Sequence, residues 1–146
     1  MDLSLTDILL RLGAAVFLGG LLGIERELNG HWAGLRTLMT VAMGSAIFAM
    51  LGLAVGSESM RDPTRVIQGI AAGVGFLGAG TILKLSDQVE VKGLTTAGAI
   101  WLSAAVGTAA GLGEQTIAMA ATVMSLIVLA VLRPLEKWVE RRTGKE

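Results

Sequence analysis

The charged residues of this chain are gathered in short clusters that separate long apolar stretches. Four stretches contain no charged side chain, namely residues 37–57, 66–83, 93–113 and 115–132. Each is long enough to cross a hydrocarbon core of about 30 Å as an α-helix. A fifth stretch, residues 8–24, is interrupted only by Arg11, whose long side chain can reach the membrane interface. The pattern predicts an all-α bundle of five transmembrane helices over residues 1–133.

The positions of the basic residues predict how this bundle is oriented. With five crossings, residues 25–36, residues 84–92 and the C-terminal tail lie on the same side of the membrane, and most Lys and Arg residues fall there. The positive-inside rule then places the N-terminus outside and the C-terminus in the cytosol. The tail, residues 134–146, begins with Pro134 and is expected to form a short amphipathic helix along the membrane surface. A frayed end is the alternative for its last five residues.

Two short motifs occur twice in the same order. "GLLG" at 20–23 is followed by "GLRT" at 34–37, and "GFLG" at 75–78 is followed by "GLTT" at 93–96. This predicts a parallel two-helix repeat in which helices 1 and 2 correspond to helices 3 and 4, with the fifth helix outside it. A chance match remains the alternative, because Gly and Leu are abundant throughout the chain.

Glycine is unusually frequent, with 20 residues in 146, and its spacing suits close helix packing. Gly-xxx-Gly pairs occur on four of the five predicted helices: Gly19/Gly23, Gly52/Gly56, Gly69/Gly73 and Gly107/Gly111. "GVGFLGAG" at 73–80 matches the G-x-G-x-x-G pattern of dinucleotide-binding loops, but it lies in an uncharged apolar stretch rather than between a strand and a helix. We therefore expect a packing segment there, with local unwinding of the helix as the alternative; its residues are Gly69, Gly73, Gly75, Gly78 and Gly80. Glycine faces left unpaired would favour a homo-oligomer.

The densest polar stretch is "GIERELNGHWAGLRT" at 23–37. A cation at the start of a helix opposes the helix dipole, so Arg36 is expected to seek an acidic partner or a phosphate, and Glu25 or Glu27 is the nearest candidate. The hypothesis is a charge network that seals or gates the cytosolic mouth of the bundle, formed by Glu25, Arg26, Glu27 and Arg36. Hydroxyls at the starts of the second and fourth helices are expected to cap or line them; these are Thr37, Thr95 and Thr96. The alternative is an ordinary interfacial loop anchored by Trp32.

Metal chemistry has few candidates in this sequence. The chain has no cysteine and only one histidine, His31, so thiolate and multi-histidine sites are excluded. Gln68, within the third helix, is expected to hydrogen-bond to another helix, and coordination of a dehydrated cation is the alternative. Loop carboxylates could bind Mg²⁺ weakly, although solvated loop charge is the favoured interpretation; they are Glu58, Asp62, Asp87 and Glu90. The sequence predicts no other cofactor.

Other functional classes lack their characteristic residues. No basic stripe or aromatic platform suits a nucleic acid, and no nucleophile, paired-acid or cofactor pattern suggests an enzyme. No Asp or Glu lies in the middle of a predicted span, which weakens the case for an ion-coupled transporter.

Four ordered motifs resemble the MgtC/SapB family of bacterial inner-membrane proteins. They are "GIERE", "AGLRT", "GIAAGVGFLGAG" and "KGLTTAGAIWLSAAVG", and the resemblance covers about residues 8–133. It implies a five-span membrane domain without the soluble C-terminal domain of several members, and a role in magnesium limitation and, in some bacteria, virulence. It also implies modulation of membrane machines such as the F-type ATP synthase. The positions that match the family pattern are Glu25, Arg26, Glu27, Gly34, Arg36, Thr37, Gly78, Gly80, Thr95 and Thr96.

Two functional hypotheses follow for a protein of the bacterial inner membrane. In the first, a non-enzymatic protein embedded in the lipid bilayer contributes to magnesium homeostasis by binding other membrane complexes through its helix faces and polar cluster. In the second, the chain forms a small oligomeric Mg²⁺ channel or transporter that the charge network gates.

Overall fold

Five helices account for most of the chain. The computed structural model describes residues 3–55, 63–84 and 91–143. The helices are α1 (Leu5–Leu28), α2 (Leu35–Ala54), α3 (Pro63–Ala79), α4 (Leu94–Leu112) and α5 (Gln115–Thr143). Between α3 and α4, the two-residue strands β1 (Leu83–Lys84) and β2 (Val91–Lys92) pair in an antiparallel ladder. The expected helical bundle is thus present, with this short ladder as an addition.

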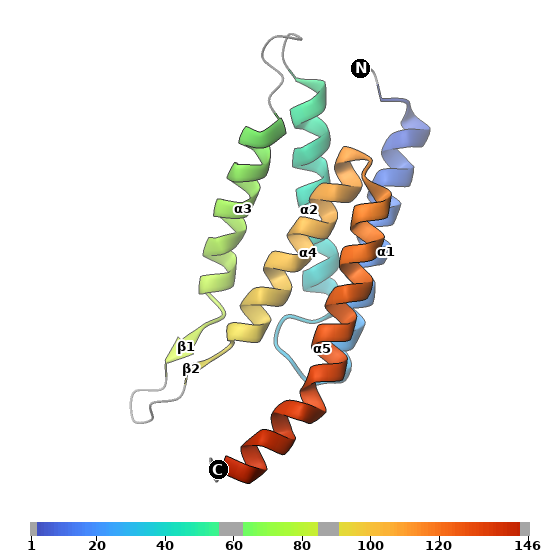
Figure 1. Cartoon of the computed structure of the whole chain (residues 1–146). Helices are drawn as coiled ribbons and strands as arrows, with labels where there is room; N and C mark the ends of the chain where they lie inside the picture. The colour runs from blue at the N-terminus through green and yellow to red at the C-terminus, as the bar shows by residue number, and fades with distance from the viewer. Residues whose placement is uncertain (1–2, 56–62, 85–90, 144–146) are drawn as a thin grey trace.

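Neighbouring helices along the chain run in opposite directions, so α2 and α4 run parallel to each other (Figure 1). The loop at residues 29–34 and the β1–β2 ladder lie at one end of the bundle, which we call the ladder end. The N-terminus and the turn between α4 and α5 lie at the opposite end. By length and composition, α1, α2 and α4 can each cross a membrane, and residues 115–130 of α5 form a shorter apolar helix.

Helix α2 packs tightly between α1 and α4, and glycines make both contacts possible. A Cβ added at Gly19 of α1 would lie 2.7 Å from the Cβ of Ala42, and one at Gly111 of α4 would lie 2.5 Å from the carbonyl oxygen of Ala46. Gly23 and Gly107 are similarly close to the backbone of α2. These two Gly-xxx-Gly pairs therefore lie where α1 and α4 approach α2 closely.

Buried hydrogen bonding reinforces the contact between α2 and α4. The Ser103 hydroxyl of α4 donates to the carbonyl oxygen of Leu38 in α2 at 2.7 Å, and both residues are fully buried. The two parallel helices are therefore joined by a polar contact in an otherwise apolar core.

Helix α3 is held more loosely, because only Val74 and Gly78 are buried along its length. A Cβ added at Gly78 would lie 3.5 Å from the Cβ of Ala97 in α4, whereas a Cβ at Gly69, Gly73 or Gly75 would meet nothing within 4 Å. These three glycines therefore do not pack against the rest of the bundle, unlike the tightly packed pairs of α1 and α4. The spacing of small residues permits two helices to approach closely, but it does not determine whether a second helix lies against them.

The segment at residues 73–80 is not unwound. Helix α3 continues to Ala79, and Gly80 follows directly after its end, where the Thr81 hydroxyl donates to the carbonyl oxygen of Gly78 at 2.7 Å. Glycine residues within a helix lower its stability but do not by themselves break it. In the Gly-xxx-Gly pair predicted for α2, a Cβ added at Gly52 would lie 2.6 Å from a methyl group of Val66 in α3, and Gly56 lies outside the described residues.

The last helix is longer than the predicted span. α5 extends from Gln115 to Thr143 as one helix, so the predicted tail at residues 134–146 is reached without an interruption in the helix. Its final part projects beyond the bundle at the ladder end (Figure 1). The proline at position 134 is accommodated within this helix.

Candidate functional site

The most deeply buried charge of the described chain is Arg26, in the last turn of α1. Its side chain is 2% exposed. Its Nη1 lies 3.8 Å from Oε2 of Glu25, and its Nη2 donates to the Thr96 hydroxyl at 3.3 Å. Because Thr96 is in the first turn of α4, the guanidinium connects the end of α1 to the start of α4 inside the bundle. A buried charge is retained only when it is paired and hydrogen-bonded, so these contacts hold the two helices together at the ladder end.

Glu25 is positioned by the residue one turn further on. The Asn29 amide donates to Oε1 of Glu25 at 2.6 Å and also to the Glu25 carbonyl oxygen at 2.8 Å. The Glu25 side chain is 10% exposed, so its carboxylate lies largely inside the protein beside Arg26. Asn29 therefore ends the helix and fixes the counter-charge of Arg26 at the same time.

Glu27 has a different function from its neighbours, since its carboxylate caps the next helix. Its Oε2 accepts a hydrogen bond from the backbone N–H of Leu35 at 2.9 Å. Gly34, the N-cap residue of α2, has no side chain to satisfy this N–H. A Cβ at Gly34 would collide with the Glu27 carboxylate, so glycine is required for this contact. A carboxylate at a helix N-terminus is stabilised by the helix dipole.

Arg36 does not join this network. It is exposed, and no ion pair joins it to Glu25 or Glu27 among the residues that the structure describes. The predicted pairing is therefore absent, because Glu25 contacts Arg26 and Glu27 caps α2. The cluster that the structure assembles is Glu25, Arg26, Asn29 and Thr96.

The threonines predicted as caps are arranged unequally. Thr37 and Thr95 are exposed, whereas Thr96 is buried against Arg26. The N-cap of α4 is Gly93 with a positive φ of 98°, and no side chain caps this helix. Thr96 therefore lines the start of α4 and does not cap it, because its hydroxyl accepts a hydrogen bond from Arg26 and not from the helix backbone.

At the opposite end, Arg11 makes a contact that the sequence did not reveal. Its Nη1 donates to the carbonyl oxygen of Gly111 at 2.8 Å, in the last turn of α4. A cation at a helix C-terminus is favoured by the dipole and satisfies a carbonyl that has no partner within the helix. Two arginines of α1, Arg11 and Arg26, thus bind the two ends of α4. The sequence contained one indication of this contact, since an arginine within an apolar stretch requires a polar partner.

The remaining candidates make few contacts. Gln68 is exposed and makes no hydrogen bond to another described residue, so the expected bond across helices is not seen. In the described part of the chain, no group of three or more His, Cys, Asp or Glu side chains could hold a metal ion. The loop carboxylates that could bind Mg²⁺ weakly lie outside it; these are Glu58, Asp62, Asp87 and Glu90.

Comparison with known proteins decides the family. The model of the MgtC family matches residues 12–138. The chain belongs to the MgtC family. The resemblance inferred from the four motifs is therefore confirmed, and Arg26, Glu27, Gly34 and Thr96 all lie in the matched region.

Individual relatives agree with this assignment. The chain is 46% identical over 129 residues to Protein MgtC of Brucella abortus, which covers 88% of this chain and 52% of that protein. It is 41% identical over 125 residues to Protein MgtC of Salmonella typhimurium, covering 86% of this chain and 52% of that protein. It is 39% identical over 137 residues to Protein SrpB of Synechococcus elongatus, covering 87% and 75% of the two chains. The chain thus spans about half the length of these MgtC relatives, and no solved structure matches it.

Proposed function

We propose that this member of the MgtC family is a non-enzymatic protein of the bacterial inner membrane that acts in adaptation to Mg²⁺ limitation by binding other membrane proteins. All five helices cross the membrane in this proposal. The N-terminus lies outside, and the ladder end and C-terminus lie in the cytosol. The F-type ATP synthase is one candidate partner, and a second copy of the chain is another.

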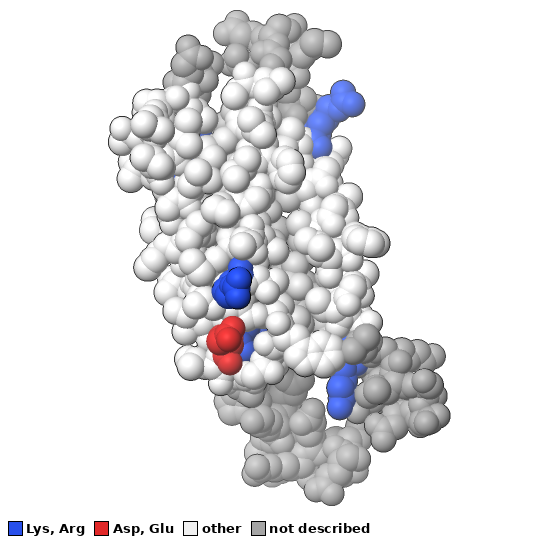
Figure 2. All heavy atoms as spheres, turned by 180° about the vertical axis from the view of Figure 1, so that it is seen from behind, with Lys and Arg blue, Asp and Glu red and all other residues white. Residues whose placement is uncertain are grey.

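Family membership is the observation that carries this proposal, because the MgtC/SapB resemblance implies a role in magnesium limitation. The distribution of charge supports the membrane placement. On the face shown in Figure 2, the part just above the middle of the molecule carries no charged side chains, with a basic side chain above it and basic and acidic side chains below it. An apolar band of this kind is expected where helices face lipid.

The surfaces available for partners also support a binding role. Gly75 and Phe76 lie on a part of α3 that does not pack against the bundle, and Phe76 is 81% exposed. In lipid, helix association depends on close packing of such small and large side chains rather than on the hydrophobic effect. This face of α3 can therefore accept a helix of another membrane protein.

The proposal is tested by deleting the gene and measuring growth, membrane potential and cellular ATP at limiting and replete Mg²⁺. We expect a defect only at limiting Mg²⁺ that the wild-type chain restores, and that Phe76→Arg restores less well than the matched change Phe17→Arg on α1. Phe17 is a suitable control because it is also exposed, at 65%, on a different helix. A deletion strain that equals its parent in all three measurements at limiting Mg²⁺ would contradict the proposal.

The orientation is tested separately by cysteine labelling, for which the chain is a natural background because it has no cysteine. Trp32, 72% exposed at the ladder end, and Glu114, exposed at the opposite end, are each replaced with cysteine. A membrane-impermeant maleimide applied from outside should label Glu114→Cys in intact spheroplasts, and Trp32→Cys only after permeabilisation. The reverse pattern would refute the orientation.

A further inference from the structure

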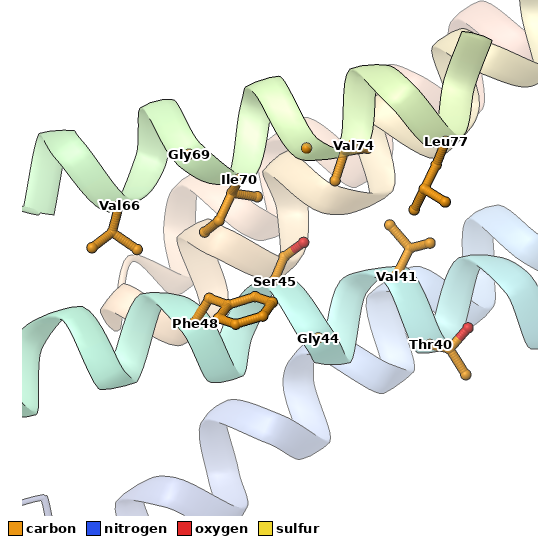
Figure 3. Close-up of a pocket in the computed structure, with 11 residues that line it drawn as sticks. Thr40, Val41, Gly44, Ser45, Phe48, Val66, Gly69, Ile70, Val74 and Leu77 are labelled. Atoms are coloured by element: carbon orange, nitrogen blue, oxygen red, sulfur yellow. The ribbon is translucent and has the colours of Figure 1, made fainter. Parts of the chain in front are cut away.

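A long apolar groove separates α2 from α3. Its volume is about 690 Å³, and its walls include Val41 and Phe48 from α2 and Ile70, Val74 and Leu77 from α3. Figure 3 shows Ile70, Val74 and Leu77 directed toward α2, with Val41 directed toward α3. None of the residues that line the groove is charged.

Glycines create the room in this groove. Gly44 of α2 and Gly69 and Gly73 of α3 all line it, and a Cβ at any of the three would meet nothing within 4 Å. A methyl group at any of these positions would therefore fit without touching other residues. A void of this size exposed to a bilayer is occupied, since an empty apolar cavity forfeits its dispersion contacts.

A polar cavity at the start of α2 shares one lining residue with the groove. This second cavity has a volume of about 640 Å³ and is lined by residues that include Glu27, Trp32, Arg36 and Thr37. The shared residue is Thr40. Arg36, Thr40, Gly44 and Phe48 follow one another at four-residue intervals and therefore share one face of α2. A single ligand can extend along this face from the polar cavity into the groove.

The polar cavity presents two opposite charges that do not neutralise each other. Arg36 and Glu27 both line it, and no ion pair joins them among the described residues. One oxygen of the Glu27 carboxylate accepts a hydrogen bond from the N–H of Leu35, and the other accepts none from the residues that the structure describes. Trp32 is 72% exposed beside them, as is typical of a side chain at the level of lipid headgroups.

We propose that these two cavities form one binding site for a phospholipid with a zwitterionic, primary-ammonium headgroup, of the phosphatidylethanolamine type. The acyl chain occupies the groove between α2 and α3, the phosphate pairs with Arg36, and the ammonium group donates to the Glu27 carboxylate. Charge complementarity selects this headgroup, because an anionic lipid offers the Glu27 carboxylate no cationic partner and a quaternary ammonium has no N–H to donate. The site takes the membrane placement proposed above as given and goes beyond the proposed function.

The test is native mass spectrometry of the purified full-length chain, titrated with phosphatidylethanolamine, phosphatidylcholine or phosphatidylglycerol carrying identical acyl chains. We expect phosphatidylethanolamine to bind about tenfold more tightly than either other lipid, the effect of roughly one charge-assisted hydrogen bond. Arg36→Ala should weaken binding of all three lipids. Glu27→Gln keeps an oxygen for the Leu35 N–H and should abolish the preference over phosphatidylglycerol.

Substitutions in the groove test the acyl-chain end of the site. Gly73→Leu should abolish binding, whereas Gly98→Leu, at another open glycine that does not line the groove, should leave it unchanged. Gly69→Leu provides a second groove variant if Gly73→Leu fails to fold. Equal affinity for the three lipids, or binding that survives both Arg36→Ala and a folded groove variant, would overturn the proposal.

Insertion into vesicles of the same three lipids separates this site from the membrane placement. A chain that does not insert contradicts the membrane placement itself. A chain that inserts but shows no headgroup preference overturns only the lipid site.

Discussion

Replacing Gly107 with alanine adds one methyl group at the point where α4 meets α2. The new Cβ would lie 2.6 Å from both the carbonyl carbon and the Cα of Ala42, and closer still to its carbonyl oxygen. Ordinary contacts begin at 3.4 Å, so the two helices would have to separate locally by at least about 0.8 Å, the difference between this distance and 2.6 Å. The atoms in the way belong to backbone and cannot rotate aside. Overpacking of this kind costs about 1–3 kcal/mol of unfolding free energy.

Gly98→Ala on the same helix is the matched control, because a Cβ there would meet nothing within 4 Å. Both substitutions gain about 0.5–1 kcal/mol from the higher helix propensity of alanine. The difference between their unfolding free energies therefore isolates the steric cost of about 1–3 kcal/mol at Gly107. Unfolding in a mixed-micelle titration, followed by tryptophan fluorescence, measures both variants against the wild type. A Gly107→Ala protein as stable as Gly98→Ala would refute the close approach of α2 and α4.

Three further substitutions test the polar contacts. Thr96→Val removes the hydroxyl that accepts a hydrogen bond from buried Arg26 and should lower the unfolding free energy by about 1–3 kcal/mol. Thr95→Val, at the exposed neighbouring position, should change the unfolding free energy little. Equal effects of the two substitutions would contradict the buried contact. Glu27→Ala removes the cap of α2 and should lower the unfolding free energy by about 0.5–2 kcal/mol, while Glu27→Gln should retain most of that stabilisation. Hydrogen exchange at the Leu35 amide measures the loss of the cap directly. Ser103→Ala should cost only about 0.6 kcal/mol, typical of hydrogen bonds between membrane helices, and a loss several times larger would mean that the hydroxyl has another role.

The positions of the helices were predictable from the sequence because a bilayer requires long uncharged segments. Each of the five predicted stretches overlaps one helix, although α3 ends at Ala79 and α2 at Ala54, both before the predicted stretches end. Their ends were less predictable, since α1 continues to Leu28 and α5 to Thr143. Charged residues can continue a helix into water, because the backbone hydrogen bonds of a helix do not depend on apolar side chains.

The candidate site was predictable only in outline. The sequence drew attention to Glu25, Arg26, Glu27 and Thr96, which the structure places at one end of the bundle. It could not show that Glu27 binds a backbone N–H instead of Arg36, because that choice depends on the turn at residues 29–34 and on the missing side chain at Gly34. The same limit applies to the glycines. Gly107 and Gly69 have the same spacing to a following glycine, and only the fold determines that one meets a helix and the other faces a groove.

The most direct test of the account is Mg²⁺ flux into dye-loaded proteoliposomes under an imposed gradient, comparing the wild type with Glu25→Ala and Arg36→Ala. Insertion and folding are verified first in the same vesicles. A protein that acts by binding other membrane proteins should give no flux above empty liposomes, for the wild type and for both variants. Saturable Mg²⁺ flux that the substitutions alter would contradict this account and establish the chain as a transporter gated at its ladder end.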